Sequence, residues 1–317
     1  MSYNGWKNIM IRVNILITTY NLEKYIAKCL ESVLQQKTSF DYKIIVSDDA
    51  STDKTSEILM KYKEEYPKKI ELILRDKNVG SLANSIGLYE KCDTEYFAFL
   101  DGDDYWITDD RLQKQVDFLD ANSKYVICGG NTRYLYENSL DRRKTVIPKK
   151  YLGKKYSIDD FYSQKVPFVH TSSILFRNVV FRNGVPDIYY KVLGTYEECA
   201  LRGEDFRFLL HLNYGNMYIM KEGYSIYRIH KGGIWQGSSE IIRELESVIY
   251  YNFNKKIWKE HSEFFLGLRN RAYIKLMNTL IKDKRFIKEY RLNDKEHLYY
   301  SHLINDLKNE NRDGSII

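Results

Sequence analysis

The stretch YFAFLDGDDYW, residues 96–106, joins an apolar run to three aspartates, Asp101, Asp103 and Asp104. Five consecutive apolar residues before a glycine-containing turn predict a buried β-strand that ends at Leu100. Carboxylates this close together raise each other's pKa unless a divalent cation or hydrogen-bond donors neutralise them. The stretch therefore predicts a ligand-binding turn, in which Gly102 allows a close approach, or an Asp/Gly-rich surface turn.

Strands alternate with helices before this turn. The apolar patterns predict strands at residues 13–19, 42–47, 70–75 and 96–100, and helices at 26–34, from about 53, and at 81–92. Such alternation predicts an α/β fold with a Rossmann-like, mostly parallel sheet flanked by helices. Because ligands of these sheets bind at the carboxyl ends of the strands, the residues that follow each strand are the candidate site.

The residues after the first strand exclude two nucleotide-binding motifs. The segment ITTYNLEKY, residues 17–25, has no glycine, whereas a dinucleotide-binding turn and a phosphate-binding P-loop both need glycines there. The residues after the second and fourth strands are acidic instead. An acidic crevice binds cations directly or binds an anionic ligand through a bridging metal ion.

Composition and charge narrow the class of protein. The 317 residues are 44% hydrophobic and 29% charged, which is typical of a soluble globular protein. We expect the net charge of +6 to be dispersed, which favours anionic ligands or a membrane surface and no nucleic acid. No apolar run approaches the roughly 20 residues of a membrane span, and the four cysteines form no C-x-x-C pair. A cytoplasmic protein with free, buried thiols is the expectation.

Four motifs in register resemble a known family. They are VNILITTYN (13–21), IIVSDDASTDKT (44–55), NVGSLANSIG (78–87) and YFAFLDGDDYW (96–106). In this order and spacing they resemble the nucleotide-diphospho-sugar transferase domain of the family 2 glycosyltransferases, which has the GT-A fold. The resemblance covers about the first 110 residues strongly and continues more weakly near Glu204 and His230.

The resemblance implies a nucleoside diphosphate sugar donor and a metal ion, Mn²⁺ or Mg²⁺. It implies that Asp49 accepts a hydrogen bond from the base, which suits a UDP-sugar; alternatively, Asp48 and Asp49 cap the following helix. Gly80 lies in the third motif and is alternatively a plain turn residue. The residues implied to bind the nucleotide and sugar are Thr18, Tyr20, Asp49, Asn78, Asn84, Asp101 and Arg228. The implied metal ligands are Asp103, Asp101 and His230.

The catalytic acids are implied by LRGEDFRFLL, residues 201–210, which looks like the E-D motif of the family. Asp205 would be the general base of an inverting transfer, and Glu204 would position the acceptor. Alternatively, both acids complement the dipole of the helix that they begin. His170 resembles an acceptor-side residue or is a packed core histidine, and Gly232 and Gly233 resemble hinges of a segment that closes over the diphosphate.

These features predict a GT-A domain at residues 1–238, with a nucleotide-binding half at about 10–110 and an acceptor half at about 111–238. Residues 239–317 predict amphipathic helices that pack on the body, form a homodimer, or contact the inner face of a membrane peripherally. The expected function is sugar transfer to a glycan or lipid-linked glycan acceptor in surface polysaccharide or glycan synthesis. The alternatives are a nucleotidyltransferase and a catalytically silent nucleotide-sugar-binding or scaffold protein.

Overall fold

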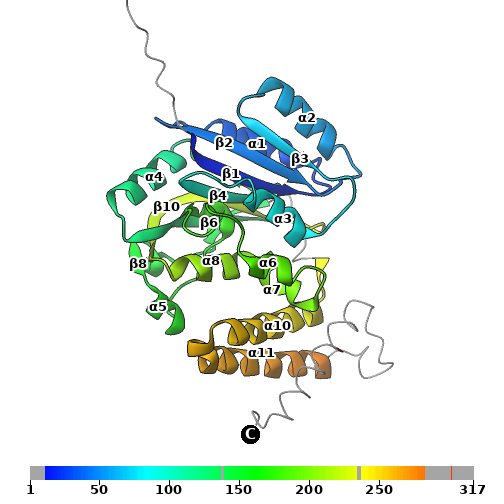
Figure 1. Ribbon diagram of the computed structural model, residues 1–317, viewed down its shortest axis with the longest axis vertical. Coiled ribbons are helices and arrows are strands. Elements are labelled where there is room, and N and C mark those ends of the chain that lie inside the picture. Colours follow the sequence, from blue (N-terminus) through cyan, green and yellow to red (C-terminus); the bar gives the residue numbers. More distant parts are fainter. Residues whose placement is uncertain (1–10, 137–138, 234–236, 283–300, 302–317) are drawn as a thin grey trace, which may run out of the picture. The chain divides into compact units, whose positions relative to one another are not determined.

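The computed structural model describes residues 11–136, 139–233, 237–282 and 301 (Figure 1). The chain divides into two compact units. The first comprises Met1–Asp187 and Glu204–Ile229, and the second comprises Ile188–Gly203 and His230–Ile317. The boundary that we expect between residues 238 and 239 stays a prediction.

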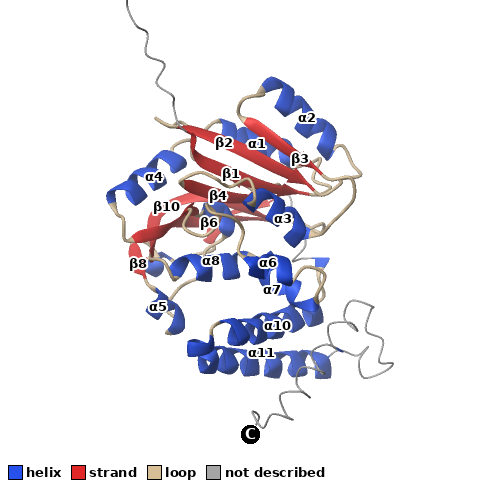
Figure 2. Ribbon diagram, viewed as in Figure 1, coloured by secondary structure: helices blue, strands red, loops and turns tan. Residues whose placement is uncertain are grey.

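The described part of the first unit is built on one ten-stranded sheet, drawn in red in Figure 2. The strand order is β3-β2-β1-β4-β9-β6-β10-β5, with β7 paired to β6 and β8 paired to β10. Neighbours among β1 to β4 are parallel, β9 is antiparallel to β4 and β6, and β10 is parallel to β6. The predicted mostly parallel sheet is therefore confirmed. The strands are β1 (Ile11–Thr19), β2 (Asp41–Asp48), β3 (Ile70–Leu74), β4 (Tyr96–Asp101), β5 (Tyr105–Trp106), β6 (Tyr125–Tyr136), β7 (Ser139–Thr145), β8 (Lys154–Tyr156), β9 (Leu175–Arg177) and β10 (Asn216–Ile229).

Helices cover both faces of this sheet. The helices and 3-10 turns of the first unit are α1 (Ile26–Leu34), α2 (Thr55–Glu65), α3 (Ser81–Tyr89), α4 (Arg111–Ala121), η1 (Lys149–Tyr151), α5 (Ile158–Tyr162), η2 (Thr171–Ser173) and α8 (Glu204–Leu212). Apolar residues of α1, α2 and α4 pack with alternate residues of β1, such as Val13 and Ile15, in one core. On the other face, Tyr89 of α3 stacks on Phe181 with ring centroids 4.1 Å apart, and His211 of α8 contacts Phe97 at 5.6 Å. Burial on both faces explains why the strands are nearly continuous apolar runs.

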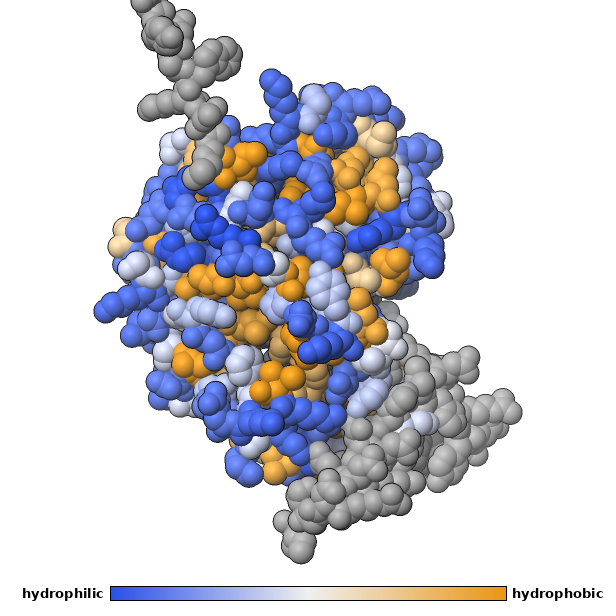
Figure 3. All heavy atoms as spheres, in the orientation of Figure 1, coloured by the Kyte–Doolittle hydropathy of each residue, from blue (hydrophilic) through white to orange (hydrophobic). Residues whose placement is uncertain are grey.

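The second unit contains the helical region that the sequence predicted. It includes η3 (Tyr196–Glu198), α7 (Cys199–Arg202), α10 (Glu240–Ile257), η4 (Lys259–His261) and α11 (Ser262–Lys282), and α6 (Asp187–Lys191) begins at its boundary with the first unit. Leu245 and Val248 of α10 are fully buried in one apolar cluster with Leu276 of α11. Within the described residues, no helix has the length and apolar character needed to cross a membrane. Figure 3 shows one face of the molecule, on which hydrophobic patches lie among hydrophilic residues.

The cysteines occupy the positions expected of structural thiols. Cys29, Cys92 and Cys128 are free and buried, as predicted. Burial raises the pKa of each of these thiols, because a thiolate loses its hydration in the core. Cys199 differs in being only half-buried.

Candidate active site

The ends of β1 and β4 bring the first two candidate residues together. The two strands are parallel neighbours, and Thr18 lies opposite Asp101 in their register. The Thr18 hydroxyl donates a hydrogen bond of 3.0 Å to Oδ1 of Asp101. The Gly102 N–H donates to the Thr18 carbonyl at 2.9 Å, so the start of the aspartate turn is tied to β1 at two points.

Gly102 lies in a crowded part of the chain, which leaves little room for a larger residue. A Cβ atom at this position would lie 3.0 Å from the Thr18 carbonyl oxygen and 3.1 Å from the Cδ1 atoms of Leu22 and Ile26. The sequence suggested that this glycine lets the turn approach a ligand. The structure gives a different reason, which is that the turn presses against β1 and the start of α1.

The aspartate turn concentrates negative charge. Burial and the neighbouring Asp103 raise the pKa of Asp101 to about 6. Burial, Asp103 and Asp101 raise the pKa of Asp104 well above its usual range. One carboxylate oxygen of Asp104 accepts the Arg228 N–H at 2.9 Å, whereas the other, fully enclosed, has no hydrogen-bond partner in the described part of the chain. A cation at this turn would relieve the repulsion among the three carboxylates.

The turn fits a metal ion that is shared with a ligand. Within the described residues, no three His, Cys, Asp or Glu side chains are arranged to hold a metal ion by themselves. Mg²⁺ and similar ions need only one or two carboxylates when phosphate oxygens and waters complete their coordination. Asp101 and Asp103, with the unsatisfied carboxylate oxygen of Asp104 beside them, fit such a partial site.

Arg228, a predicted nucleotide ligand, lies directly beside this turn. Its Nε donates a hydrogen bond of 2.9 Å to the Asp103 carbonyl. Its guanidinium lies 4.5 Å from the ring centroid of Tyr25 and 5.6 Å from that of Tyr105. A guanidinium in this position offers further N–H donors to a phosphate group.

His230 belongs to the second unit, and its role as a metal ligand stays a prediction. The same holds for the hinge role of Gly232 and Gly233. Trp235, which follows them in the sequence, lies outside the described residues.

Asp49 connects the end of β2 to the loop before α3. It is buried, and its two carboxylate oxygens accept the N–H groups of Val79 at 2.7 Å and Gly80 at 3.0 Å. The first N–H of α2, that of Thr55, is accepted by Asp53, whereas the described bonds of Asp49 go to the loop before α3, so the capping alternative does not describe Asp49. Gly80 has φ 87°, a conformation that favours glycine, and it directly precedes α3. Asp49 therefore fixes the loop that carries the third motif.

The remaining predicted nucleotide ligands differ in their surroundings. Asn84 is buried and donates to the Ser47 carbonyl at 3.0 Å, so it joins α3 to β2. Asn78 accepts the Gly80 N–H at 3.2 Å, and Tyr20 is exposed. Contact of these three side chains with a nucleotide stays a prediction.

Glu204 and Asp205 are the first two residues of α8. Burial, and then Asp205, raise the pKa of Glu204 to about 7, and the charge of Asp101 contributes to the same shift. Asp205 is exposed, and loss of hydration at its carboxyl raises its pKa. The α8 acids lie near the aspartate turn, because Arg207 of the same helix packs 4.4 Å from the ring centroid of Phe99 in β4 and the charge of Asp101 acts on Glu204.

Arg207 was missed by the sequence analysis. It is buried, donates to the Thr171 hydroxyl at 2.7 Å, bonds to the Tyr89 hydroxyl, and lies 4.4 Å from the ring centroid of Phe99. Its positive charge lowers the pKa of Asp101, Glu204 and Asp205 and so opposes the shifts caused by burial. The sequence signal that could have revealed Arg207 is its position three residues after Glu204, because oppositely charged residues at this spacing lie next to each other on a helix.

His170 lies beside the aspartate turn. Its Nδ1 is 3.6 Å from Oδ2 of Asp104 and 2.8 Å from the Ser172 hydroxyl. Burial lowers the pKa of His170 to about 4, so the ring is neutral at physiological pH. Its ring stacks on Tyr227 with centroids 4.2 Å apart. His170 is thus a packed residue, as one interpretation expected, and it also lies next to the candidate site.

Comparisons with known proteins agree with this geometry. Residues 14–184, more than half of the chain, match the model of the family described as Glycosyl transferase family 2. An uncharacterized protein of Mycobacterium tuberculosis is 28% identical over 229 residues, which cover 71% of this chain and 61% of that protein. The poly(ribitol-phosphate) beta-N-acetylglucosaminyltransferase TarS of Staphylococcus aureus is 31% identical over 121 residues, which cover 37% of this chain and 20% of TarS. The matched part of this chain therefore spans less than two thirds of each of these relatives.

Solved structures share the fold. The crystal structure of TarS 1-349 from S. aureus matches with a TM-score of 0.58 and 17% identity, over 90% of this chain and 77% of that chain. A mannosyltransferase from Pyrobaculum calidifontis, in complex with GDP-Man and Mn²⁺, matches with a TM-score of 0.51 and 15% identity, over 96% of this chain and 83% of that chain. The GT-A fold inferred from four motifs is confirmed. The chain belongs to glycosyl transferase family 2.

Proposed function

We propose that this protein transfers a sugar from a nucleoside diphosphate sugar to a hydroxyl group of a glycan acceptor, with inversion at the anomeric carbon. The observation that carries the proposal is the meeting of two acidic groups from distant parts of the chain. The aspartate turn after β4 and the acids that begin α8 lie close enough for Asp101 to raise the pKa of Glu204. Acids of this kind, with pKa values moved toward neutrality, are typical of catalytic sites.

The donor half of the reaction uses the aspartate turn. Asp101 and Asp103 would hold Mn²⁺ or Mg²⁺, and the Arg228 guanidinium would bind the diphosphate beside it. The bound ion would neutralise the negative charge that develops on the departing nucleoside diphosphate. In support, the relatives of known structure include TarS in complex with UDP-GlcNAc and the mannosyltransferase with GDP-Man and Mn²⁺.

A uridine nucleotide is our proposal for the base. Asp49 already accepts two backbone N–H bonds, one at each oxygen. A carboxylate has about four lone-pair positions, so Asp49 keeps the capacity to accept the imide N–H of uracil. The backbone bonds would hold the carboxylate in place for this contact.

The acceptor half uses the acids of α8. Asp205 would take the proton from the attacking hydroxyl, and the exposed position of this residue leaves it accessible to an acceptor. Arg207, two residues further along α8, lowers the pKa of Asp205 and so favours the carboxylate that a general base requires. Glu204 would position the acceptor. A base on the face opposite the leaving group gives inversion.

The test has a binding step and a transfer step. Thermal unfolding of the purified chain is measured with UDP, GDP, CDP, ADP or TDP and with the corresponding nucleoside triphosphates, each with Mn²⁺ or with a chelator. Stabilisation by one diphosphate only with metal is the expected result, and release of that diphosphate from its sugar conjugates is then measured. Asp205→Asn should lose at least about 100-fold in transfer while keeping diphosphate binding.

One control variant and three contrary outcomes make the result decisive. Glu57→Gln changes an acid on α2, a helix that lies well apart from α8, and should transfer at the wild-type rate (Figure 1). Near-full transfer by Asp205→Asn would contradict its role as the base. Stabilisation by nucleoside triphosphates in place of diphosphates would favour a nucleotidyltransferase, and binding with no transfer to any acceptor would favour a silent scaffold.

The acceptor and the second unit add further proposals. The acceptor is a glycan or a lipid-linked glycan of surface polysaccharide synthesis. Contact of residues 239–317 with a membrane or with a second copy of the chain is tested by vesicle flotation and by sedimentation of the purified chain.

A further inference from the structure

Five rings from three separate segments form a continuous line, here called the aromatic ladder. The rings of Phe168 and His170 meet edge-on with their centroids 6.3 Å apart, and the ring of His170 stacks on that of Tyr227 with centroids 4.2 Å apart. Tyr227 contacts Tyr134 at 5.9 Å, and Tyr134 stacks on Tyr136 at 6.0 Å. Phe168 is 52% exposed, and the three tyrosines are half-buried. The aromatic ladder therefore offers ring surface to a ligand.

The strand register explains why these rings share one face. In the parallel pair β6 and β10, Tyr134 lies opposite Tyr227, and two residues earlier Thr132 lies opposite Ser225. Side chains two residues apart in a strand point to the same face. The Thr132 and Ser225 hydroxyls are 2.8 Å apart, and the Ser172 hydroxyl donates to Ser225 at 2.9 Å. These buried hydrogen bonds anchor the base of the aromatic ladder.

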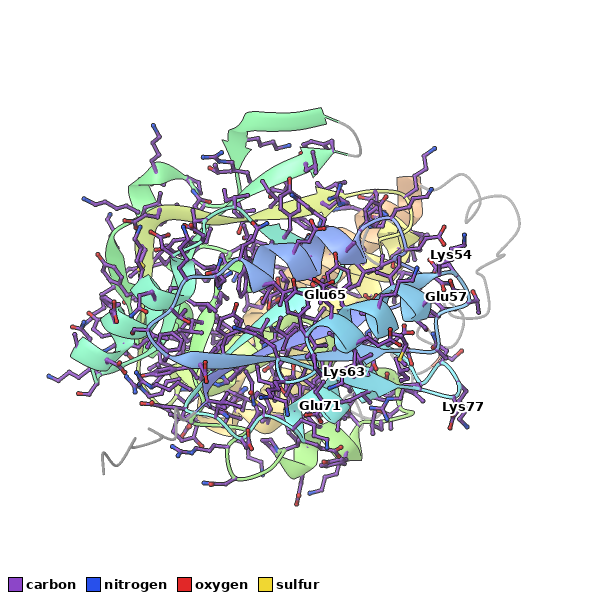
Figure 4. All side chains as sticks on the ribbon, turned by 90° about the horizontal axis from the view of Figure 1, so that it is seen from above. Lys54, Glu57, Lys63, Glu65, Glu71 and Lys77 are labelled. Atoms are coloured by element: carbon purple, nitrogen blue, oxygen red, sulfur yellow. The ribbon has the colours of Figure 1, made fainter. Side chains whose placement is uncertain are left out.

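The aromatic ladder leads away from the candidate active site. Its His170 ring lies 3.6 Å from the buried carboxylate of Asp104. Its outer rings, Tyr134 and Tyr136, are at the end of β6, where the β6–β7 hairpin stands apart from the other strands in Figure 4. An extended ligand on these rings would present one end to the aspartate turn.

Positive charge accompanies the outer rings. The exposed Lys144 lies 5.3 Å from the ring centroid of Tyr134 and 5.0 Å from that of Tyr136, and it donates to the Tyr136 hydroxyl at 2.5 Å. Residues 131–156 contain eight Lys or Arg residues and two Asp or Glu residues, a net charge of +6 that equals the net charge of the whole chain. The expectation that this charge is dispersed was wrong.

The α2 region does not share this charge excess. Residues 54–65 contain three lysines and three glutamates, among them Lys54, Glu57, Lys63 and Glu65, and so have no net charge (Figure 4). A surface with a local excess of one sign attracts partners of the opposite sign. The segment that carries the outer rings is therefore suited to an anionic partner.

We propose that the aromatic ladder and Lys144 form the acceptor subsite, and that its ligand is an anionic saccharide. The apolar faces of sugar rings would pack on the aromatic side chains, and phosphate or carboxylate groups would bind Lys144 and its basic neighbours. Rings placed in line suit a chain of sugars better than a lipid headgroup. This inference rests on the proposed function, because it assigns the acceptor of the same site.

The experiment measures saccharide binding to the full chain by calorimetry. The probes are an oligouronate, a phosphate-bearing oligosaccharide, and an uncharged oligosaccharide of the same length. We expect at least one anionic probe to bind about tenfold more tightly than the uncharged probe, and added salt to weaken that binding. Comparison of the two anionic probes identifies carboxylate or phosphate as the preferred group.

Variants locate the binding surface. Tyr136→Ala and Lys144→Gln should each weaken binding of the anionic probe by about fivefold or more, the size expected for the loss of one anchoring side chain. Lys61→Gln, an exposed lysine of α2, is the matched control and should bind the probe as the wild type does. Thermal unfolding of each variant shows whether it is folded.

Two results would overturn the inference: equal binding of charged and uncharged probes, or unchanged binding by the folded Tyr136→Ala variant. Vesicles of phosphatidylglycerol and phosphatidylcholine provide a further test. Retention on vesicles that Lys144→Gln abolishes, with no saccharide binding, would assign this surface to a membrane instead. Metal-dependent diphosphate binding is measured on the same samples, so failure of the donor site is distinguished from failure of the acceptor subsite.

Discussion

Gly102→Ala tests whether the aspartate turn is held in place by close packing. The added methyl group would lie 3.0 Å from the Thr18 carbonyl oxygen and 3.1 Å from side-chain atoms of Leu22 and Ile26. Contacts of 3.0–3.4 Å are tighter than nine in ten observed for real Cβ atoms. Because one of the three contacts is with the backbone, rotation of a side chain cannot relieve all of them.

The size of the effect follows from this crowding. The backbone conformation of Gly102 is not in the left-handed region, so the cost is steric. Overpacking of one methyl group in a close-packed region costs about 1–3 kcal/mol, and we expect the free energy of unfolding to fall by this amount. The shift would also strain the 2.9 Å hydrogen bond from Gly102 to Thr18 and move Asp101. Metal-dependent diphosphate binding should therefore weaken as well.

Urea unfolding at neutral pH measures the stability, and a titration of UDP with Mn²⁺ measures the site. The matched control is Gly267→Ala in α11, where a Cβ atom would meet no atom within 4 Å. That change should stabilise the protein by about 0.5–1 kcal/mol, because alanine has the higher helix propensity. Gly102→Ala with wild-type stability and wild-type diphosphate binding would refute the packing explanation.

The pKa shifts and the Asp49 contacts give two further predictions. The pKa of Asp101 is raised to about 6 and that of Glu204 to about 7. In metal-free protein, the two carboxyl groups therefore stay protonated in the folded state at pH values at which they are ionised in the unfolded chain. The free energy of unfolding should therefore fall as the pH rises from about 4 to about 7. Urea titrations with a chelator should show that the Asp101→Asn variant loses less stability than the wild type over this range. The same pH dependence in both proteins would contradict the raised pKa of Asp101. Asp49→Ala should destabilise the fold by about 1–3 kcal/mol, because the Val79 and Gly80 N–H groups lose their acceptor, and Asn at this position should restore part of the loss. Urea unfolding of both variants decides this, and equal stability of the two would count against it.

Local patterns made the first four strands of the sheet predictable. The apolar runs of β1, β2 and β4 are buried on both faces, and such strands have a strong signal over few residues. The first four strands are parallel neighbours, so the residues that follow them reach the same edge of the sheet. Thr18 and Asp101 were therefore placed together correctly from sequence.

Long-range partners were beyond the reach of these patterns. Arg207 is a single basic residue in an apolar helix, and its influence on Asp101 depends on how α8 packs on the sheet. The closeness of the α8 acids to the aspartate turn has the same origin, since about 100 residues separate Glu204 from Asp104. The sequence predicted Glu204 and Asp205 only through a family resemblance, whereas Arg207 is identified by how α8 packs in the structure.

The sequence by itself determined the first four strands, the helices between them and the carboxyl edge that carries the aspartates, because short-range apolar periodicity sets which residues are buried. Only the tertiary structure decided the reason for Gly102, the bonds of Asp49 to the α3 loop, and the line of rings from His170 to Tyr136. Each of these depends on atoms from segments far apart in the chain that meet within a few ångströms. Contacts of that kind are set by the register and packing of whole elements, which no local pattern records.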